Sequence, residues 1–453
     1  MNNKIKKYFT PSINRHTFAI INKTIKNMTI ILLLIFCIGY AAIAFENSIK
    51  INKTASAIVT GVLCWVTYIF FTSNKLQVNE SLLIHLGDIS SILFFLMGAM
   101  TIVELVDAHD GFEIITEFIS QTNKKRLIWI VGFITFFLSA ILDNLTTTIV
   151  MVSLLRKLIK NNDDRLLFIG IVVIAANAGG AWTPIGDVTT TMLWIGGQIS
   201  TMNISQKLFL PSLVCLIIPL IAISFQLKGK VERVVTKPQS PDNILTRKKQ
   251  QIILVLGLLV LILVPVFKTY THLPPFMGML LGLGILWIIT EVMYKDENQE
   301  EKKHLTLVNA LHKIDISSIL FFLGILMAIA ALESSGILST TALWLSKTIG
   351  NLSAIVMSIG LSSAIIDNVP LVAATQGMYS LTQYPMDNYL WEFLAFCAGT
   401  GGSILIIGSA AGVAAMGMEK IDFFWYVKKI SWLALLGYLA GAFVYMGIEK
   451  LFY

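Results

Sequence analysis

Two Asp-Asn pairs, Asp143-Asn144 and Asp367-Asn368, stand inside otherwise apolar sequence. Each pair ends a stretch of the form Ser-Ala-Ile-(Leu/Ile)-Asp-Asn. An ionisable side chain in a membrane-spanning segment costs about 2.5–3.5 kcal/mol to insert and by default marks an ion or proton pathway. Carboxylate, amide and hydroxyl oxygens are the ligands that hard cations prefer. A carboxylate can also bind a proton instead, so the two pairs predict sites at which a cation and a proton compete.

Asp187 is the third carboxylate of this kind. It follows a helix-breaking run, Asn177–Asp187, that contains two adjacent glycines and a proline. Thr189 and Thr190 add hydroxyl oxygens, whereas the matching positions of a second, similar segment hold Ser409, Ala411 and Gly412. The predicted ion-site residues are Asp143, Asn144, Thr146, Asp187, Thr189, Thr190, Asp367 and Asn368, with Asn177, Ser363 and Ser403 as weaker candidates.

Each acid also has a structural interpretation, because a carboxylate at a helix N-terminus can cap the helix. One buried cap would be unremarkable, but two at equivalent places in a repeat favour transport. For Asp88 and Asp315, which we expect to begin their helices, the two interpretations are equally good.

The composition predicts a polytopic membrane protein. Hydrophobic residues make up 55% of the 453 residues and charged residues only 13%, which leaves several uncharged stretches near the length needed to cross a bilayer. The net charge of +7 resides in loops, so nucleic-acid binding is disfavoured. The four cysteines form no CxxC pair, and we expect no cofactor and no resident metal.

The motifs recur. Asp88–Leu96 returns unchanged as Asp315–Leu323, and Ala178-Gly-Gly is echoed by Thr400-Gly-Gly, all about 225 residues apart. We therefore expect a basic N-terminal tail (1–28), a first repeat (29–227), a basic cytoplasmic linker (228–251) and a second repeat (252–453).

The segments around the Asp-Asn pairs are short. The stretch Leu127–Leu142 reaches only about 24 Å as a helix, less than a hydrocarbon core of about 30 Å. Basic residues flank the first pair of arms on both sides, at Lys124–Arg126 and Arg156–Lys157. We interpret each pair of arms as a re-entrant hairpin with the Asp-Asn pair at its tip, although one long kinked helix is the alternative.

This interpretation gives the fold class: an all-α polytopic membrane protein of two inverted-topology repeats, each with a re-entrant hairpin and an interrupted transmembrane helix. Inverted repeats with paired broken helices are typical of secondary transporters. The distribution of Lys and Arg predicts that the first hairpin opens to the cytoplasm, in a multi-pass protein of the cell inner (plasma) membrane. The same count of Lys and Arg places the basic N-terminal tail outside the cell, which conflicts with the positive-inside rule.

At these motifs the sequence resembles the NhaD-type sodium/proton antiporters, whose superfamily includes dicarboxylate/sodium symporters and arsenite carriers. The resemblance runs from about residue 30 to the C-terminus. It implies exchange of cytoplasmic Na⁺, and Li⁺, for external protons, and a fold with two re-entrant hairpins. The chain departs from the dicarboxylate branch, in which Ser stands where Asp143 and Asp367 stand here.

Two other functions compete with antiport. A symporter or arsenite-type anion carrier would require a basic or purely dipolar binding site, yet the sequence has no Lys or Arg near either Asp-Asn pair. An intramembrane aspartyl protease could use Asp143 and Asp187 but would explain neither Asp367 nor the duplication. We therefore expect no enzyme, with Na⁺, Li⁺, H⁺ and the lipid bilayer as partners; a homodimer stays open.

Overall fold

The computed structural model describes residues 15–114, 119, 121–232, 246–297 and 302–452. Throughout these ranges the fold is all-α, with one isolated backbone bridge between Asn123 and Lys230. Nine helices among the described residues are long and apolar enough to cross a membrane, or up to ten if a bent pair counts as one span. The predicted class of an all-α polytopic membrane protein is confirmed.

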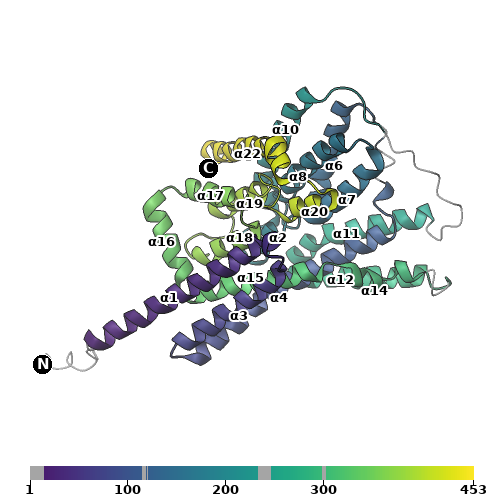
Figure 1. The fold of residues 1–453 in the computed structure, drawn as a ribbon. Helices are drawn as coiled ribbons and strands as arrows, with labels where there is room; N and C mark the ends of the chain where they lie inside the picture. Colours follow the sequence, from purple (N-terminus) through teal and green to yellow (C-terminus); the bar gives the residue numbers. More distant parts are fainter. Residues whose placement is uncertain (1–14, 115–118, 120, 233–245, 298–301, 453) are drawn as a thin grey trace.

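The first half of the chain, shown from purple to teal in Figure 1, contains α1 (Arg15–Ala44), α2 (Glu46–Ile49), α3 (Lys53–Phe71), α4 (Lys75–Ala108), α6 (Lys124–Leu142), α7 (Asn144–Leu158), α8 (Asn162–Gly180), α9 (Val188–Ile195) and α10 (Thr201–Gln226). The second half contains α11 (Arg247–Thr271), α12 (Pro275–Met293), α14 (Leu307–Lys313), α15 (Ile316–Ser334), α16 (Ile337–Ile349), α17 (Leu352–Ser362), α18 (Asn368–Met378), α19 (Tyr389–Gly401), α20 (Ala410–Glu419), α21 (Phe423–Tyr426) and α22 (Trp432–Phe452).

Several predicted boundaries are wrong. Asp88 does not begin a helix but lies inside the long helix α4, whereas its counterpart Asp315 does cap α15 by accepting from the backbone N–H of Ser318 at 3.1 Å. Helix α1 already begins at Arg15, inside the predicted tail, of which residues 1–14 lie outside the described residues. The helix starts were predicted at the change from polar to apolar sequence, but a helix that leaves the membrane can continue into water.

Two further differences concern the second half. The helix α16 was not predicted; it is joined to α17 at an angle of 115°. The helix α11 begins at Arg247, inside the range of the predicted linker, and residues 233–245 of that linker lie outside the described residues.

Helices α6 and α7 form a hairpin. The backbone N–H of Lys124, where α6 begins, donates to the carbonyl of Gly229 at 3.1 Å. The N–H of Lys160, just after α7, donates to the carbonyl of Glu232 at 2.9 Å. Both outer ends therefore meet one short segment, and Asp143 lies between the helices at the far tip. The alternative of one long kinked helix is excluded.

The second hairpin consists of α17 and α18. Near the start of α17, the hydroxyls of Ser353 and Tyr389 are 2.8 Å apart. Just after α18, the ring of Tyr379 lies 5.4 Å from that of Tyr384, whose carbonyl accepts from the indole of Trp391. Both outer ends thus lie at the start of α19, and Asp367 lies at the tip.

The hairpins open toward opposite ends of α4. At one end of α4, Glu104 pairs with Lys313 at 3.1 Å; this is the side on which Arg156 of α7 pairs with Glu419. At the other end, His85 contacts the hydroxyl of Ser334 at 3.1 Å, and α18 passes beside Glu333. These contacts support the inverted arrangement of the two repeats, which stays a prediction.

We expect cysteines placed at Lys125 and Lys160 to react with a membrane-impermeant thiol reagent from the same side of the membrane, since both residues are exposed at the open end of the first hairpin. The labelling should be done separately in right-side-out and inside-out vesicles. Labelling of the two positions from opposite sides would overturn the hairpin.

The glycine pairs let the broken helices approach the hairpins. A Cβ built on Gly179 of α8 would lie 2.2 Å from the carbonyl oxygen of Phe136 in α6. In the second half a Cβ on Gly401 would lie 2.0 Å from the carbonyl oxygen of Gly360 in α17. The predicted interruptions are confirmed but begin only after these glycines, because α8 ends at Gly180 and α19 ends at Gly401. The role of the glycines is close backbone packing.

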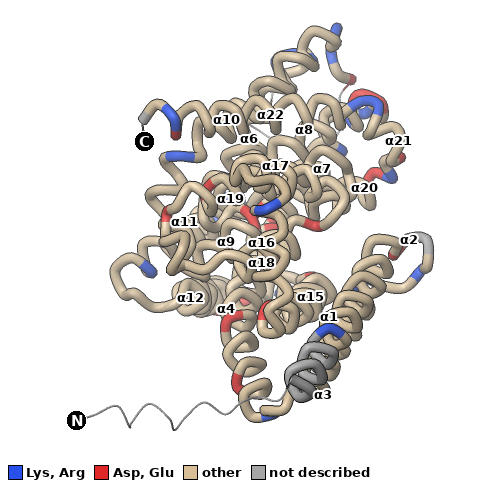
Figure 2. The backbone as a smooth tube through the Cα atoms, turned by 90° about the vertical axis from the view of Figure 1, so that its left-hand side faces the viewer, with Lys and Arg blue, Asp and Glu red and all other residues tan. Residues whose placement is uncertain are grey.

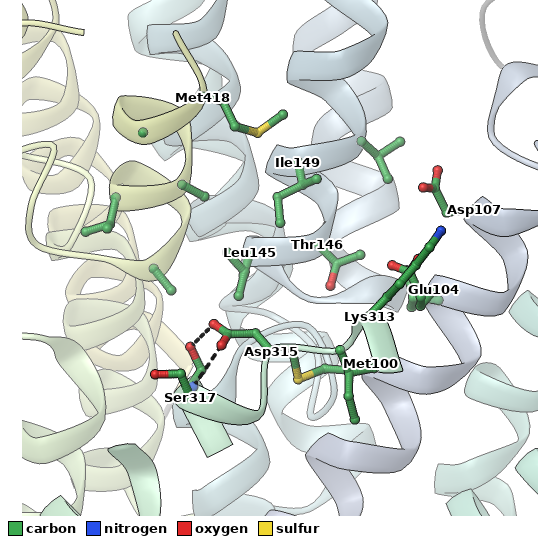
Figure 3. Close-up of a pocket in the computed structure, with 18 of the residues that line it drawn as sticks. Met100, Glu104, Asp107, Leu145, Thr146, Ile149, Lys313, Asp315, Ser317 and Met418 are labelled. Atoms are coloured by element: carbon green, nitrogen blue, oxygen red, sulfur yellow. Dashed lines mark hydrogen bonds and ion pairs between the residues drawn. The ribbon is translucent and has the colours of Figure 1, made fainter. Parts of the chain in front are cut away.

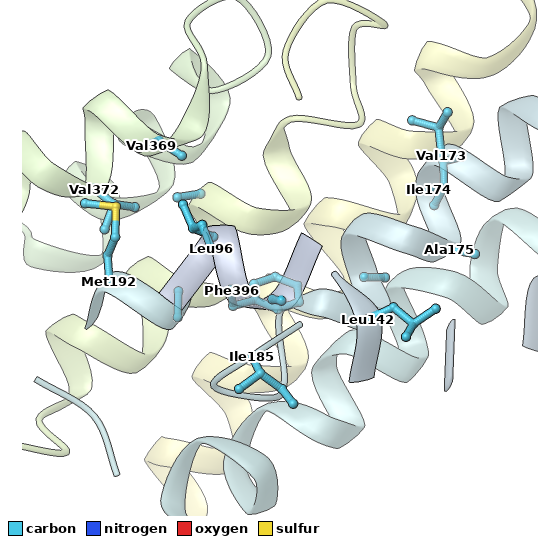
Figure 4. Close-up of a cluster of buried hydrophobic side chains, with 14 of the residues drawn as sticks. Leu96, Leu142, Val173, Ile174, Ala175, Ile185, Met192, Val369, Val372 and Phe396 are labelled. Carbon is cyan, nitrogen blue, oxygen red and sulfur yellow. The ribbon is translucent and has the colours of Figure 1, made fainter. Parts of the chain in front are cut away.

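Apolar side chains fill the space around the hairpin tips and the breaks. Figure 4 shows Leu142 from the first hairpin, Val369 and Val372 from the second, and Ile185 and Phe396 from the two broken helices, all buried. Most charged residues lie toward the periphery of the molecule (Figure 2). The fold therefore keeps a few polar groups in an apolar interior, where each must find a partner.

Candidate functional site

Asp187 lies at the centre of the polar cluster. It caps α9, and its Oδ1 accepts from the backbone N–H and the hydroxyl of Thr189, both at 2.9 Å. Its Oδ2 accepts from the amide of Asn144 at 2.7 Å and from that of Asn368 at 3.4 Å. The carboxylate is only 1% exposed. One buried carboxylate therefore joins the tips of both hairpins.

Asn177 completes this cluster from α8. Its Oδ1 accepts from the amide of Asn144 at 3.1 Å, and its own amide donates to the hydroxyl of Ser409 at 3.1 Å. Ser409 caps α20 as Asp187 caps α9, which confirms that the two positions correspond. The cluster thus joins both hairpins and both broken helices, with its negative charge on the first repeat's side only.

Asp143 caps the second arm of the first hairpin. Its two carboxylate oxygens accept from the backbone N–H and the hydroxyl of Thr146, both at 2.8 Å. Its backbone has φ 103° and ψ 160°, a conformation that non-glycine residues rarely adopt. Such strain clusters at functional sites, where the surrounding structure enforces it. The turn is held in a fixed geometry, with Asp143 half-buried at its tip.

Asp367 is the equivalent residue of the second hairpin and is also half-buried. Its Oδ1 accepts from the backbone N–H of Val369 at 3.2 Å. No hydrogen bond to its Oδ2 occurs within the described part of the chain. The second carboxylate oxygen of Asp367 is therefore available to a cation or a proton. Asp187 accepts from Asn144 and Asn368, which directly follow the two hairpin aspartates in the chain.

The positive ends of four helices surround these groups, because Asp143, Asp187, Asp367 and Ser409 cap α7, α9, α18 and α20. Helix N-termini stabilise negative charge, so the fold can keep carboxylates ionised in an apolar interior. A monovalent cation bound there would neutralise a charge that the helix ends only partly compensate.

The remaining predicted residues take different places. Thr189 contacts Asp187 directly, whereas the hydroxyl of Thr190 donates to the Asp187 carbonyl at 2.9 Å. Ser363 donates to the carbonyl of Ala398 at 2.9 Å, and Ser403 donates to that of Thr400 at 2.7 Å. These last two serines tie backbone segments together, and no contact joins them to Asp187 among the described residues. Their part in ion binding stays a prediction.

A water-accessible path leads to the first hairpin. A cavity of about 800 Å³, which we call the vestibule, has Glu104, Asp107 and Lys313 on its wall and reaches Leu145 and Thr146 (Figure 3). Gly417 and Met418 also line it, and Arg156 donates to the carbonyl of Met418. The vestibule wall therefore includes residues of α7, the second arm of the first hairpin, and of α20.

Sequence reasoning missed one charged residue of this region. No Lys or Arg is near the hairpin tips in the sequence, but the fold brings Lys53 of α3 to the vestibule wall. No local signal in the sequence could have found it, because the vestibule wall joins segments more than half the chain apart.

Two helical hairpins and two interrupted helices that meet at a buried carboxylate are an arrangement typical of a secondary transporter. Within the described residues no group of three or more His, Cys, Asp and Glu side chains could hold a resident metal. A transported cation would instead be a substrate, bound weakly by a mixture of carboxylate, amide and hydroxyl oxygens.

Comparison with known proteins gives the family. A family model described as "Citrate transporter" matches residues 40–399. The chain is 52% identical to "Sodium/proton antiporter 1" of Arabidopsis thaliana, over 94% of this chain and 73% of that protein. It is 48% identical to "Sodium/proton antiporter 2" of the same plant, over 92% and 99% of the two chains. "Na(+)/H(+) antiporter NhaD" of Alkalimonas amylolytica is 29% identical over 92% and 89%.

The chain therefore belongs to the citrate transporter family and, within it, to the NhaD-type sodium/proton antiporters. The resemblance seen in the motifs is confirmed over most of the chain.

Proposed function

We propose that this protein exchanges Na⁺, and also Li⁺, from the cytoplasm for external protons across the plasma membrane. The observation that carries the proposal is the Asp187 carboxylate, which accepts an amide from each hairpin tip. A cation or proton that binds there changes the charge on the one group that both hairpins share. Occupancy and hairpin position are thereby coupled, as alternating access requires.

The charges of the cluster favour a cation over an anion. A citrate-like anion would meet Asp187, Asp143 and Asp367, and would have to displace or neutralise all three carboxylates. A hard cation finds oxygen ligands there. This is why we assign cation exchange to the chain although the matching family model is described by citrate transport.

The aspartyl protease alternative lacks its central contact. Such an enzyme needs two carboxylates that share a proton directly. Both oxygens of Asp143 instead accept from Thr146, and the oxygens of Asp187 accept from Thr189 and the two hairpin amides. We therefore propose transport without a catalysed reaction.

The test is Na⁺-dependent dequenching of a pH-sensitive dye in acidified inside-out vesicles that contain the purified protein. NaCl and LiCl should each restore the fluorescence, and KCl serves as the control salt. Because protons compete with Na⁺ for the same carboxylates, the KM for Na⁺ should fall as pH rises, by up to about tenfold per pH unit for each proton displaced.

At high pH the KM should level off, since all carboxylates are then free. Absence of any Na⁺-induced signal over the pH range would refute exchange. A KM independent of pH would refute competition at shared carboxylates while leaving exchange itself intact.

A further inference from the structure

Lys53 is a charged residue of the vestibule that the exchange described above does not use. It is the first residue of α3 and is half-buried. Its ammonium lies 4.7 Å from the centroid of the Phe321 ring. Within the described part of the chain Lys53 forms no ion pair, and Glu46 accepts only from its backbone N–H. The positive charge of Lys53 is therefore not neutralised by a partner.

The position of this lysine is electrostatically unfavourable. The N-terminus of a helix carries a partial positive charge, which repels a cation in the first turn. Asn52 caps α3 by accepting from the N–H of Thr54 at 2.8 Å, so the helix start needs no help from Lys53. Neither local stability nor an ion pair explains why a lysine stands here.

The surroundings connect Lys53 to the second hairpin. Phe321, over which the ammonium lies, belongs to α15, and α15 packs against α18, the helix that Asp367 caps. Lys53 also lines the vestibule, which reaches Thr146, the residue that binds Asp143 at the tip of the first hairpin. The vestibule wall holds a second cation, Lys313, which pairs with Glu104. Among the described residues, Lys53 is therefore the vestibule cation without an ion pair.

We propose that Lys53 is a positioning residue that sets the Na⁺ affinity of the transport site. Its ammonium is a fixed cation on the vestibule wall, and it weakens the attraction of the carboxylates at the hairpin tips for an incoming Na⁺. A transported ion must bind well enough to enter and weakly enough to leave. Lys53 offsets part of the negative charge that the carboxylates present to the ion. This inference rests on the proposed Na⁺/H⁺ exchange.

The test is the change Lys53→Gln, measured as initial rates of exchange at a series of Na⁺ concentrations and at a pH high enough that protons no longer compete. Removal of one positive charge from the vestibule wall should lower the KM for Na⁺ about three- to tenfold. The maximal rate should fall, because Na⁺ then leaves more slowly. Lys53→Arg keeps the charge and should retain the KM of the unmodified protein.

Lys75→Gln is the matched control. Lys75 is likewise the first residue of a helix behind an Asn cap, but it is exposed and does not line the vestibule. Its substitution should leave both constants unchanged. An unaltered KM in Lys53→Gln would overturn the proposal, as would the same altered KM in Lys53→Gln and Lys53→Arg.

A chemical version separates charge from folding. Lys53→Cys, in a chain whose exposed Cys37 is replaced by Ser, can be modified after purification with a neutral or a trimethylammonium-bearing methanethiosulfonate. The cationic adduct should raise the KM for Na⁺ relative to the neutral adduct on the same folded protein. Equal values for the two adducts would refute the role of charge. Absence of Na⁺/H⁺ exchange by the protein with its original sequence would instead refute the proposed function.

Discussion

The change Asp187→Asn is expected to reduce Na⁺/H⁺ exchange to the background level. The amide carries no charge, and it also cannot replace the hydrogen bonds of the carboxylate. One carboxylate oxygen accepts from Asn144 and Asn368 and the other from Thr189. In either orientation the substituted amide would point an N–H group at one of these donors. Each unmatched buried donor costs about 1–3 kcal/mol, so the contact between the two hairpins is lost along with the charge.

The measurement is dye dequenching in vesicles with matched protein content, over a range of pH and Na⁺ concentration. Asp163→Asn is the control. Asp163 is an exposed aspartate in the first turn of α8, whereas Asp187 follows the break after this helix and caps α9. A fall in Na⁺ affinity at every pH identifies Asp187 as an ion ligand. A shift of the activity profile to lower pH, with the maximal rate kept, means that Asp187 acts on a neighbouring carboxylate. A variant with unaltered affinity and pH profile would show that Asp187 is structural.

Asp143→Asn and Asp367→Asn should each abolish exchange while the protein stays in the membrane. The substitution keeps the shape and one acceptor oxygen, so the amide side chain can still cap α7 in the first variant and α18 in the second. The amide neither carries charge nor takes up a proton in this pH range. Each hairpin should therefore still form but should no longer bind the cation or exchange a proton. The exchange rate is measured with the purified, reconstituted variants.

The variants Asp143→Asn and Asp367→Asn should also differ in thermal stability, because the two carboxylates cap their helices differently. Both oxygens of Asp143 are engaged by Thr146, whereas Oδ2 of Asp367 has no partner within the described residues. Asp143→Asn should therefore lower thermal stability by about 1 kcal/mol, since two charge-assisted hydrogen bonds are replaced by weaker neutral ones, and Asp367→Asn should change it less. Normal exchange by either purified variant would remove that residue from the ion site.

The sequence by itself determined the class of the fold and the location of its unusual segments. The apolar composition required membrane-spanning helices, and the brevity of the arms beside Asp143 and Asp367 indicated hairpins. Both follow from local physics, since a helix of known rise either reaches across the bilayer or does not. Sequence patterns could not set the helix ends, as α4, α16 and the end of α8 at Gly180 show. Tertiary packing decides where a helix continues, and it outweighs local propensity.

Only the tertiary structure decided which polar groups meet. The sequence singled out Asp187, Asn144 and Asn368 as separate candidates, and the fold joins them at one carboxylate. Lys53 gave no sequence signal, because it is an ordinary lysine near a span end until α3 packs beside α15. Ser363, in contrast, binds the backbone of α19 in the fold. The physical reason is range: hydrophobicity and helix breaking act over a few residues, whereas the charges and hydrogen bonds of a transport site join residues that are neighbours only after folding.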